Sequence, residues 1–339
     1  MKNSNKHILI IRFSSLGDVA MTVPVISEML NSHPSLKISI LTKKHFTPIY
    51  SHLETVNVIG VDFQNEYRGL SGLLKLSKKI KTLNVDFIAD LHNVLRTKIL
   101  KLFLLGCSYK AINKARSEKK KLVKGKSFKP LKSTIERYAD VIRAFGLKLN
   151  LENPKFPPPL VLSSSLKEMI KINTKSLIGV APFAAYKSKI YPLDKMKNII
   201  NILSKDYTVV LFGGGKNETK ILDKIANQSS SIISFSGKVP MEEEIQLMSH
   251  LKLMISMDSG NAHMAAMMGV KVITLWGVTH PFAGFKPFNQ PFSNCLLSDR
   301  SAFPLIPTSI YGNIYPKNYE NAIASIPESE VLKAIKNNI

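Results

Sequence analysis

The chain has 339 residues, 45% of them hydrophobic and 21% charged, which is enough apolar material for two domains with cores of their own. No apolar run reaches the roughly 18 residues that a membrane-spanning helix needs, and the short apolar start carries Arg12 and lacks a small-residue cleavage site, so a cytoplasmic protein is expected. Cys107 and Cys295 form no C-x-x-C pair, so neither a disulfide framework nor a thiolate metal site is indicated.

The net charge of +23 is distributed unevenly. The residues before Asn150 contain 27 Lys and Arg against 10 Asp and Glu, and residues 96–132 hold thirteen basic residues and a single acid, Glu118. Such a surface attracts polyanions, whether nucleic acid, an anionic membrane or a phosphorylated glycolipid. A lysine-rich proteome would produce part of this charge without any partner.

Apolar runs alternate with amphipathic stretches along the first half of the chain. We expect strands at 8–12, 37–41, 56–61, 86–90 and 108–112, and helices at 18–31, 45–51, 70–83, 94–105 and 133–145. Pro24 predicts an irregular first turn or a kink in the first helix. This alternation predicts a parallel sheet covered by helices on both faces.

A proline-rich stretch, 153–159, separates this half from a second one of the same kind. Strands are expected at 177–181, 208–212, 232–235, 253–257 and 270–276, with helices at 193–203, 218–227, 241–249 and 262–268. From Phe282 the chain reads as irregular, with one helix at 328–337. We therefore predict an α/β protein with domains at 1–155 and 156–315, followed by a tail at 316–339.

The stretch M-D-S-G-N-A-H-M-A-A-M-M-G-V-K-V-I-T-L-W-G-V-T-H-P, residues 257–281, reads as strand, loop, helix and strand. Gly260 allows close approach of the backbone, and the first N–H groups of the helix carry partial positive charge. The loop is therefore suited to an anion such as a diphosphate. An ordinary βαβ unit with a capped helix is the alternative.

This stretch resembles the C-terminal signature of the ADP-heptose:lipopolysaccharide heptosyltransferases, glycosyltransferase family 9. The stretch R-F-S-S-L-G-D-V-A-M-T-V-P-V-I, which starts at Arg12, resembles the N-terminal signature of the same family. The resemblance runs from Ile8 to about Phe288. It implies a GT-B fold, with two Rossmann-like doubly wound domains facing across a cleft, the first binding the acceptor and the second the nucleotide sugar.

By this resemblance Asp18 is the general base of an inverting transfer, in which one carboxylate removes the proton of the acceptor hydroxyl. Its alternative role is that of a helix cap, which contributes about 1 kcal/mol. Ser15 and Gly17 share its loop. The resemblance also implies acceptor contacts from a strand end and from the basic stretch, namely from Asp90, His92, Arg96, Lys119, Lys120 and Lys121.

The donor side follows from the same resemblance. In A-P-F-A-A-Y-K-S-K-I-Y-P, residues 181–192, a lysine is expected to reach the diphosphate; Lys189 matches best, Lys187 is an alternative, and Tyr191 stands where the family usually has Trp. The other implied donor residues are Glu218, which would reach the ribose after the triple glycine 213–215, and Asp258, Ser259, Gly260, Asn261 and His263. His280 leaves the recognition of the sugar open.

The sequence has no H-E-x-x-H, no paired Cys and no D-x-D, so neither a metal nor a cofactor is expected. The predicted function is transfer of a heptose from ADP-heptose to the lipopolysaccharide inner core, with peripheral contact to the inner face of the membrane. Another sugar nucleotide or acceptor is one alternative. The other is a non-catalytic basic protein that binds nucleic acid or membrane, although the chain has no recognisable nucleic-acid reading motif.

Overall fold

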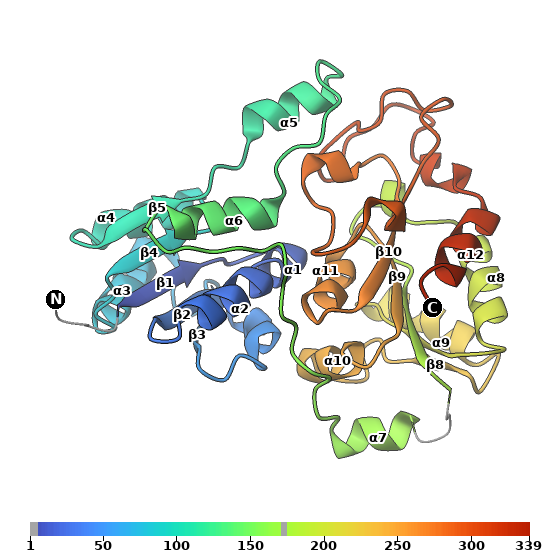
Figure 1. The fold of residues 1–339 in the computed structure, drawn as a ribbon, viewed down its shortest axis with the longest axis horizontal. Coiled ribbons are helices and arrows are strands. Elements are labelled where there is room, and N and C mark those ends of the chain that lie inside the picture. The colour runs from blue at the N-terminus through green and yellow to red at the C-terminus, as the bar shows by residue number, and fades with distance from the viewer. Residues whose placement is uncertain (1–5, 171–174) are drawn as a thin grey trace. The chain divides into compact units, whose positions relative to one another are not determined.

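The computed structural model describes residues 6–170 and 175–339, and the chain divides into two compact units (Figure 1). Unit 1 comprises residues 1–114 and 134–155, and unit 2 comprises residues 115–133 and 156–339. Across the described part of the chain, no helix combines the length and the apolar character needed to span a bilayer.

Unit 1 is built on a five-stranded parallel sheet. Its order is β3-β2-β1-β4-β5, from β1 (His7–Ile11), β2 (Lys37–Lys43), β3 (Asn57–Val61), β4 (Phe87–Asp90) and β5 (Ser108–Ala111). The helices are α1 (Leu16–Ala20), α2 (Val23–Ser32), α3 (Gly69–Lys81), α4 (Leu95–Phe103) and α6 (Thr134–Arg143). β1 is buried along its whole length, and its apolar run from Ile8 to Ile11 is what a sheet with two covered faces requires.

Unit 2 repeats this plan with six parallel strands in the order β11-β10-β9-β6-β7-β8. They are β6 (Leu177–Ala181), β7 (Thr208–Leu211), β8 (Ile232–Ser234), β9 (Leu253–Met257), β10 (Lys271–Trp276) and β11 (Cys295–Leu297). The helices are α5 (Arg116–Val123), α7 (Ser164–Ile170), α8 (Leu193–Leu203), α9 (Lys216–Ala226), α10 (Met241–Met248), α11 (Gly260–Met267) and α12 (Glu328–Lys336). α12 packs on α8, and α10 packs on α11.

Each sheet reverses its strand order once. In unit 1 the reversal falls between the neighbours β1 and β4, and in unit 2 between β6 and β9. The loops after these strands diverge to opposite faces of the sheet, and this leaves the crevice in which doubly wound folds bind ligands. The sequence motifs around Asp18, Asp90, Lys189 and Asp258 all follow these four strands.

The observed division of the chain differs from the expected one in two places. Residues 115–133 lie within the expected first domain but group with unit 2, because Phe128 packs on His280 and Phe282 and because Leu131 N–H donates to the Phe282 carbonyl. The expected separate tail also groups with unit 2. Tyr191 explains this, since its hydroxyl donates to the Ile326 carbonyl at 2.8 Å.

Local structure differs from the predicted elements where the sequence pattern was short. The helix expected at 18–31 is two helices, α1 and α2, and Pro24 lies in the first turn of the second, where it needs no N–H partner. The helix expected at 45–51 is a 3₁₀ segment, Lys44–Tyr50. The sequence prediction also missed α5, α7 and β11, which are short elements.

Candidate active site

Asp18 lies in α1, directly beyond the carboxyl end of β1, and three donors meet its Oδ2 atom. Arg12 Nη2 lies 2.7 Å away, the Ser15 hydroxyl donates at 2.8 Å and the Ser15 N–H at 3.2 Å. The backbone contact is that of a capping box, so the carboxylate does cap α1. Its side chain remains 20% exposed, and the capping role and a role toward a ligand are therefore compatible.

Arg12 is a buried cation, and the sequence pattern assigned it to an apolar strand. Its side chain is 8% exposed, and Nη1 donates to the Leu91 carbonyl at 2.7 Å. Burial opposes its charge, but the electrostatic attraction of Tyr138 and Asp18 and the hydrogen bond to Asp18 outweigh that effect and raise the pKa of Arg12. Tyr138 of α6 also donates to the Asp18 carbonyl at 3.3 Å. Arg12 and Tyr138 thus fix α1 to the sheet.

Asp90 organises the loop after β4, and its predicted contact with an acceptor stays a prediction. The side chain is 0% exposed, and its carboxylate accepts hydrogen bonds from His92 N–H, Asn93 N–H and the Tyr109 hydroxyl at 2.9, 2.7 and 2.6 Å. This carboxylate holds Asn93 in the left-handed conformation that turns the chain toward α4.

His92 stands beside the crevice of unit 1 as a neutral side chain. Desolvation by burial, then the positive charges of Arg12 and Lys114, lower the pKa of His92 to about 3, and Lys43 acts in the same direction. Its ring packs edge-on against Phe13 at 5.6 Å, while Nδ1 is buried with no hydrogen-bond partner among the described residues. Arg12, Lys43 and Lys114 are thus close enough to His92 to influence its charge, and sequence reasoning singled out none of the three.

The other predicted acceptor residues are divided between the two units. Ser15 is exposed and Gly17 is buried within α1. Arg96 is exposed on α4 of unit 1, where its guanidinium stacks on Phe63 at 4.2 Å. The basic stretch lies on α5 of unit 2, where Lys119 lies over the Phe285 ring at 4.1 Å and its two successors, Lys120 and Lys121, are exposed.

In unit 2 the predicted anion loop joins β9 to α11. Ser259 is the N-cap residue in extended conformation, and Ser259, Gly260 and Asn261 are all partly exposed, so their N–H groups lie at an accessible helix start. The Ser259 and Ser256 hydroxyls lie 3.1 Å apart. His263, one turn further, is only 7% exposed, and its contact with a donor stays a prediction.

Lys189 and Lys187 occupy different environments. Lys189 Nζ lies 2.9 Å from Asp258 Oδ2, and the Thr279 hydroxyl donates to the same oxygen at 2.8 Å. Lys187 is exposed. The side chain of Lys189 therefore points to the helix start that follows Asp258, whereas Lys187 points to solvent, and this observation favours Lys189 of the two.

The loop of Lys189 packs closely against two glycines, at positions where a larger residue would clash. A Cβ on Gly277, just after β10, would lie 1.9 Å from the Ser188 carbonyl oxygen. A Cβ on Gly312 would lie 2.6 Å from Lys189 Cδ, and the Ser188 hydroxyl donates to the Gly312 carbonyl at 2.5 Å. The region that reads as irregular in the sequence thus packs directly on the lysine.

Glu218 closes the triple-glycine turn after β7. Its Oε2 accepts from Gly214 N–H at 2.8 Å. Gly215, which precedes α9, has a φ of +85°, a conformation that favours glycine. The structure thus gives Glu218 a local role in shaping the turn, and its predicted contact with a ribose stays a prediction.

His280 is a packed aromatic residue, 2% exposed, in the turn after β10. Nδ1 accepts from Phe282 N–H at 3.1 Å, and the ring contacts Phe128 and Phe282 with centroids 5.0 and 4.4 Å away. Burial, followed by the charge of Arg300, lowers the pKa of His280 to about 4. These contacts account for His280 as a structural residue.

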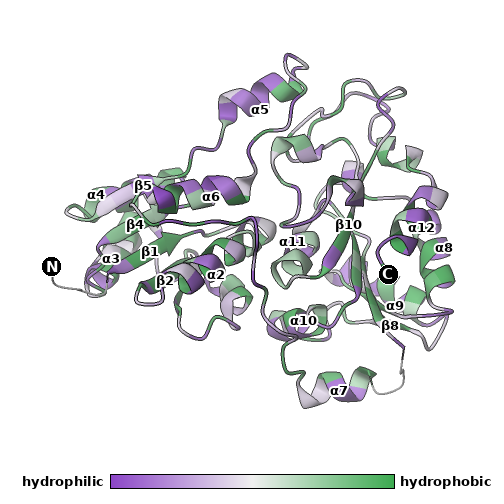
Figure 2. Cartoon of the chain, in the orientation of Figure 1, coloured by the Kyte–Doolittle hydropathy of each residue, from purple (hydrophilic) through white to green (hydrophobic). Residues whose placement is uncertain are grey.

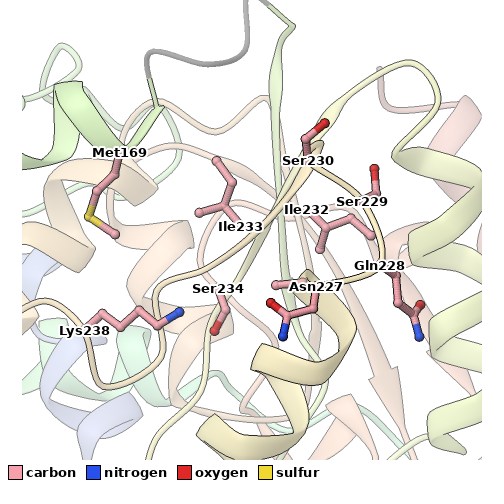
Figure 3. Close-up of a pocket in the computed structure, with 10 residues that line it drawn as sticks. Met169, Asn227, Gln228, Ser229, Ser230, Ile232, Ile233, Ser234 and Lys238 are labelled. Carbon is pink, nitrogen blue, oxygen red and sulfur yellow. The ribbon is translucent and has the colours of Figure 1, made fainter.

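A hollow of about 610 Å³ lies along the edge strand β8 (Figure 3). Ser229, Ser230 and Ser234 line it, with Lys238 and Met169 at its sides. It lies away from the reversal of strand order between β6 and β9, so the candidate active site is elsewhere. No group of three or more His, Cys, Asp or Glu able to hold a metal ion occurs among residues 6–170 and 175–339.

Two Rossmann-like parallel sheets, each with its polar loops at the reversal of strand order, are the architecture of the GT-B fold. The sequence model of glycosyltransferase family 9 (heptosyltransferase) matches residues 73–305. This match covers more than half of the chain, which therefore belongs to glycosyltransferase family 9 and is a glycosyltransferase. The resemblance read from the sequence is confirmed.

Individual relatives agree with this assignment. The chain is 26% identical over 295 residues to lipopolysaccharide heptosyltransferase 3 of Escherichia coli, covering 83% of this chain and 85% of that protein. It is 24% identical over 299 residues to lipopolysaccharide core heptosyltransferase OpsX of Haemophilus influenzae, covering 84% and 82%.

Solved structures support the fold. The family 9 glycosyltransferase of Veillonella parvula superposes with a TM-score of 0.77 at 19% identity, covering 99% of this chain and 98% of that one. ADP-heptose lipopolysaccharide heptosyltransferase II of E. coli gives 0.69 at 18% identity, covering 98% of each chain. The predicted fold class is thus confirmed for each unit.

Proposed function

We propose that the protein transfers a heptose, with inversion, from ADP-heptose to a sugar of the lipopolysaccharide inner core. Membership of the heptosyltransferase family supports this reaction, as do the names of the two curated relatives. The observation that carries the proposal is the ion pair of Lys189 with Asp258, since it brings a lysine to the helix start that is suited to a diphosphate.

The proposed donor cradle combines one cation and three amides. Lys189 has three N–H donors and uses one on Asp258, so the others are available to phosphate oxygens. The N–H groups of Ser259, Gly260 and Asn261 add the positive end of α11. These positive groups stabilise the negative charge of the departing nucleoside diphosphate, which therefore needs no protonation. Lys187, Glu218 and His263 are weaker candidates for donor contacts.

Asp18 is the proposed general base. A base must be correctly oriented before the acceptor binds, and the three donors on Oδ2 fix the direction of this carboxylate. Arg12 has a second role in this scheme. It holds the carboxylate, and it contributes charge for the anionic groups of the acceptor.

The proposed acceptor is an anionic glycolipid. The charges of Arg12, Lys43 and Lys114 near His92 suit a carboxylate or phosphate on the sugar next to the reacting hydroxyl. Arg96 can grip such a group in two-pronged fashion. A glycolipid acceptor places the enzyme in the cytoplasm, in peripheral contact with the inner face of the membrane.

The test is to incubate the purified protein with a panel of sugar nucleotides. We expect ADP-heptose to raise the melting temperature and to be consumed when extracted core glycolipid is added, with an inverted linkage in the product. If only a different sugar nucleotide raises the melting temperature and is consumed, that nucleotide is the donor. Failure of every sugar nucleotide to bind would remove the proposal and favour a protein that binds anions without transfer.

A further inference from the structure

The strongest feature outside the candidate active site is an apolar hollow of about 630 Å³ in unit 2, between the segment 122–128 and the loop 300–316. Its apolar lining includes Leu122, Phe128, Leu305 and Ile314. We call the surface formed by residues 115–133 and 300–317 the crossover face. None of its residues belongs to the donor cradle.

Large apolar side chains on this face are exposed to solvent. Leu305 and Ile314 are 60% and 66% exposed, and the aromatic residues Phe128, Tyr311 and Tyr315 are 37%, 61% and 36% exposed. Scattered exposed apolar residues are normal, but a contiguous group of this kind around a hollow marks an interaction surface. We therefore expect a partner to bind this face and to cover these side chains.

The loop that carries these side chains is firmly anchored. Ile306 is 2% exposed, its carbonyl accepts from Arg300 Nε at 2.9 Å, and Thr308 N–H donates to the Val278 carbonyl at 3.0 Å. The Thr308 hydroxyl in turn donates to the Ile314 carbonyl at 2.8 Å. These bonds fix the backbone on both sides of Leu305 and at Ile314, so the fold itself directs their side chains outward.

The two segments that border the hollow are positively charged, and Lys124 and Arg300 line the hollow itself. Residues 115–133 contain eight Lys and Arg and one acid, Glu118, and residues 300–317 contain Arg300, Lys317 and no acid. Lys120, Lys121, Lys124, Lys126 and Lys129 are all exposed, and α5 is largely hydrophilic in Figure 2. The guanidinium of Arg300 lies 3.6 Å from the centroid of the Phe128 ring, so a cation stands at the hollow itself.

We propose that the crossover face docks on an anionic lipid bilayer, with Leu305 and Ile314 entering the boundary between headgroups and acyl chains and the lysines pairing with lipid phosphates. Exposed aliphatic and aromatic side chains next to exposed lysines are the combination that interfacial membrane binding requires. A second copy of the chain would bring one positively charged face against another, and a nucleic acid would leave the aliphatic side chains uncovered.

This inference rests on the proposed function in one respect, because docking on the membrane would bring the enzyme to a lipid-linked acceptor. Vesicle binding itself needs neither donor nor acceptor, so the two proposals can fail separately. The sequence alone indicated an attraction of the basic first half to polyanions. The structure assigns the contact to a particular face of unit 2 and adds an apolar component.

The experiment measures co-sedimentation of the full-length protein with vesicles. One set contains phosphatidylcholine alone and the other phosphatidylcholine mixed with phosphatidylglycerol. We expect binding to the anionic set, weakened on the order of 100-fold in the variant Lys124→Gln/Lys126→Gln/Lys129→Gln, since each lysine near an anionic surface contributes about fivefold. The charge-matched control Lys205→Gln/Lys220→Gln/Lys224→Gln replaces exposed lysines elsewhere in unit 2 and is expected to keep more of the binding.

The apolar component is tested by Leu305→Ser/Ile314→Ser, which we expect to weaken vesicle binding by about tenfold or more while its melting temperature stays unchanged. The matched control is Leu70→Ser/Leu105→Ser, at two exposed leucines of unit 1. Both variants are expected to retain transfer to a delipidated, water-soluble acceptor. The inference is overturned by equal binding of the two serine variants, by equal binding to neutral and anionic vesicles, or by a dimer that only Leu305→Ser/Ile314→Ser abolishes.

Discussion

The side chains of Lys189 and Asp258 form an ion pair, with Nζ 2.9 Å from Oδ2 and exposures of 12% and 10%. Lys189 follows β6 and Asp258 follows β9, the two neighbouring strands at which the sheet of unit 2 reverses its order. The pair therefore joins the two loops that border the ligand crevice of a doubly wound fold. Thr279 completes the arrangement from the turn after β10.

Lys189→Gln tests this arrangement. Glutamine can still donate to Asp258 but has no charge to offer a diphosphate, so we expect kcat/KM to fall by about 10² to 10³. Steady-state kinetics with the sugar nucleotide as the varied substrate measures the loss. Lys187→Gln is the matched control, because Lys187 is exposed two residues away, and it is expected to stay within about twofold of the parent. A larger loss in Lys187→Gln would exchange the two assignments.

Gly277→Ala tests whether the loop of Lys189 depends on close approach of the backbone. The added Cβ would lie 1.9 Å from the Ser188 carbonyl oxygen, so the loop has to move. We expect a loss of about 3 kcal/mol in the free energy of unfolding and weaker donor binding. Urea unfolding followed by circular dichroism gives the first quantity. Gly214→Ala is the control, because a Cβ there meets nothing within 4 Å, and it is expected to be nearly neutral.

The sequence predicted the two sheets and the ends of their strands, because buried parallel strands read as continuous apolar runs and their loops carry the polar motifs. It could not show that Asp90 is buried, since a carboxylate at a strand end looks the same whether it binds a ligand or accepts hydrogen bonds from two loop amides and a tyrosine of the next strand. Arg12 was read as part of an apolar strand, and its partner Asp18 lies beyond the turn.

The choice between Lys187 and Lys189 also lay beyond the sequence. Lys189 is favoured by its contacts with Asp258 and Gly312, which are 69 and 123 residues away from Lys189 along the chain. The sequence also could not show that residues 115–133 belong to unit 2, because contacts between residues far apart in the chain place them there. Phe128 meets its partners through distant packing, and a charge-rich stretch gives no periodic signal of such contacts.

Glu244 predicts a pH dependence of stability. Desolvation by burial raises the pKa of Glu244 to about 7 from the usual 4.5. A folded-state pKa above the unfolded value means that the folded chain binds more protons between these limits. The free energy of unfolding that depends on the protonated Glu244 carboxyl is therefore fully present below pH 4.5. It is lost as the pH rises through about 7.

Glu244→Gln removes this charge. We expect the variant to gain about 1 to 3 kcal/mol relative to the parent at pH 8, and little at pH 5, where the parent carboxyl is already protonated. Thermal melts at the two pH values give the comparison. Glu242→Gln alters an exposed side chain in the same turn of α10 and should give equal differences at both pH values. The same gain at pH 5 and pH 8 in Glu244→Gln would contradict the raised pKa.

Asp18→Asn separates the two roles of Asp18. Asparagine can still accept hydrogen bonds from Ser15, so α1 keeps its cap, but it cannot take a proton from the acceptor. We expect turnover to fall by about 10² to 10⁴ while the melting-temperature shift caused by the donor is retained. The free energy of unfolding should fall by about 2 kcal/mol, because Arg12 stays buried without its carboxylate partner.

Ser15→Ala is the matched variant for this experiment. It removes the hydroxyl donor at 2.8 Å but leaves the carboxylate and its contact with Arg12, so transfer is expected within about tenfold of the parent. If Asp18→Asn loses no more turnover than Ser15→Ala, the carboxylate serves as a helix cap alone. The base must then be sought elsewhere among the groups of unit 1. If donor binding fails together with turnover in Asp18→Asn, the loss reflects damage to the fold, which the melting curve without donor would show independently.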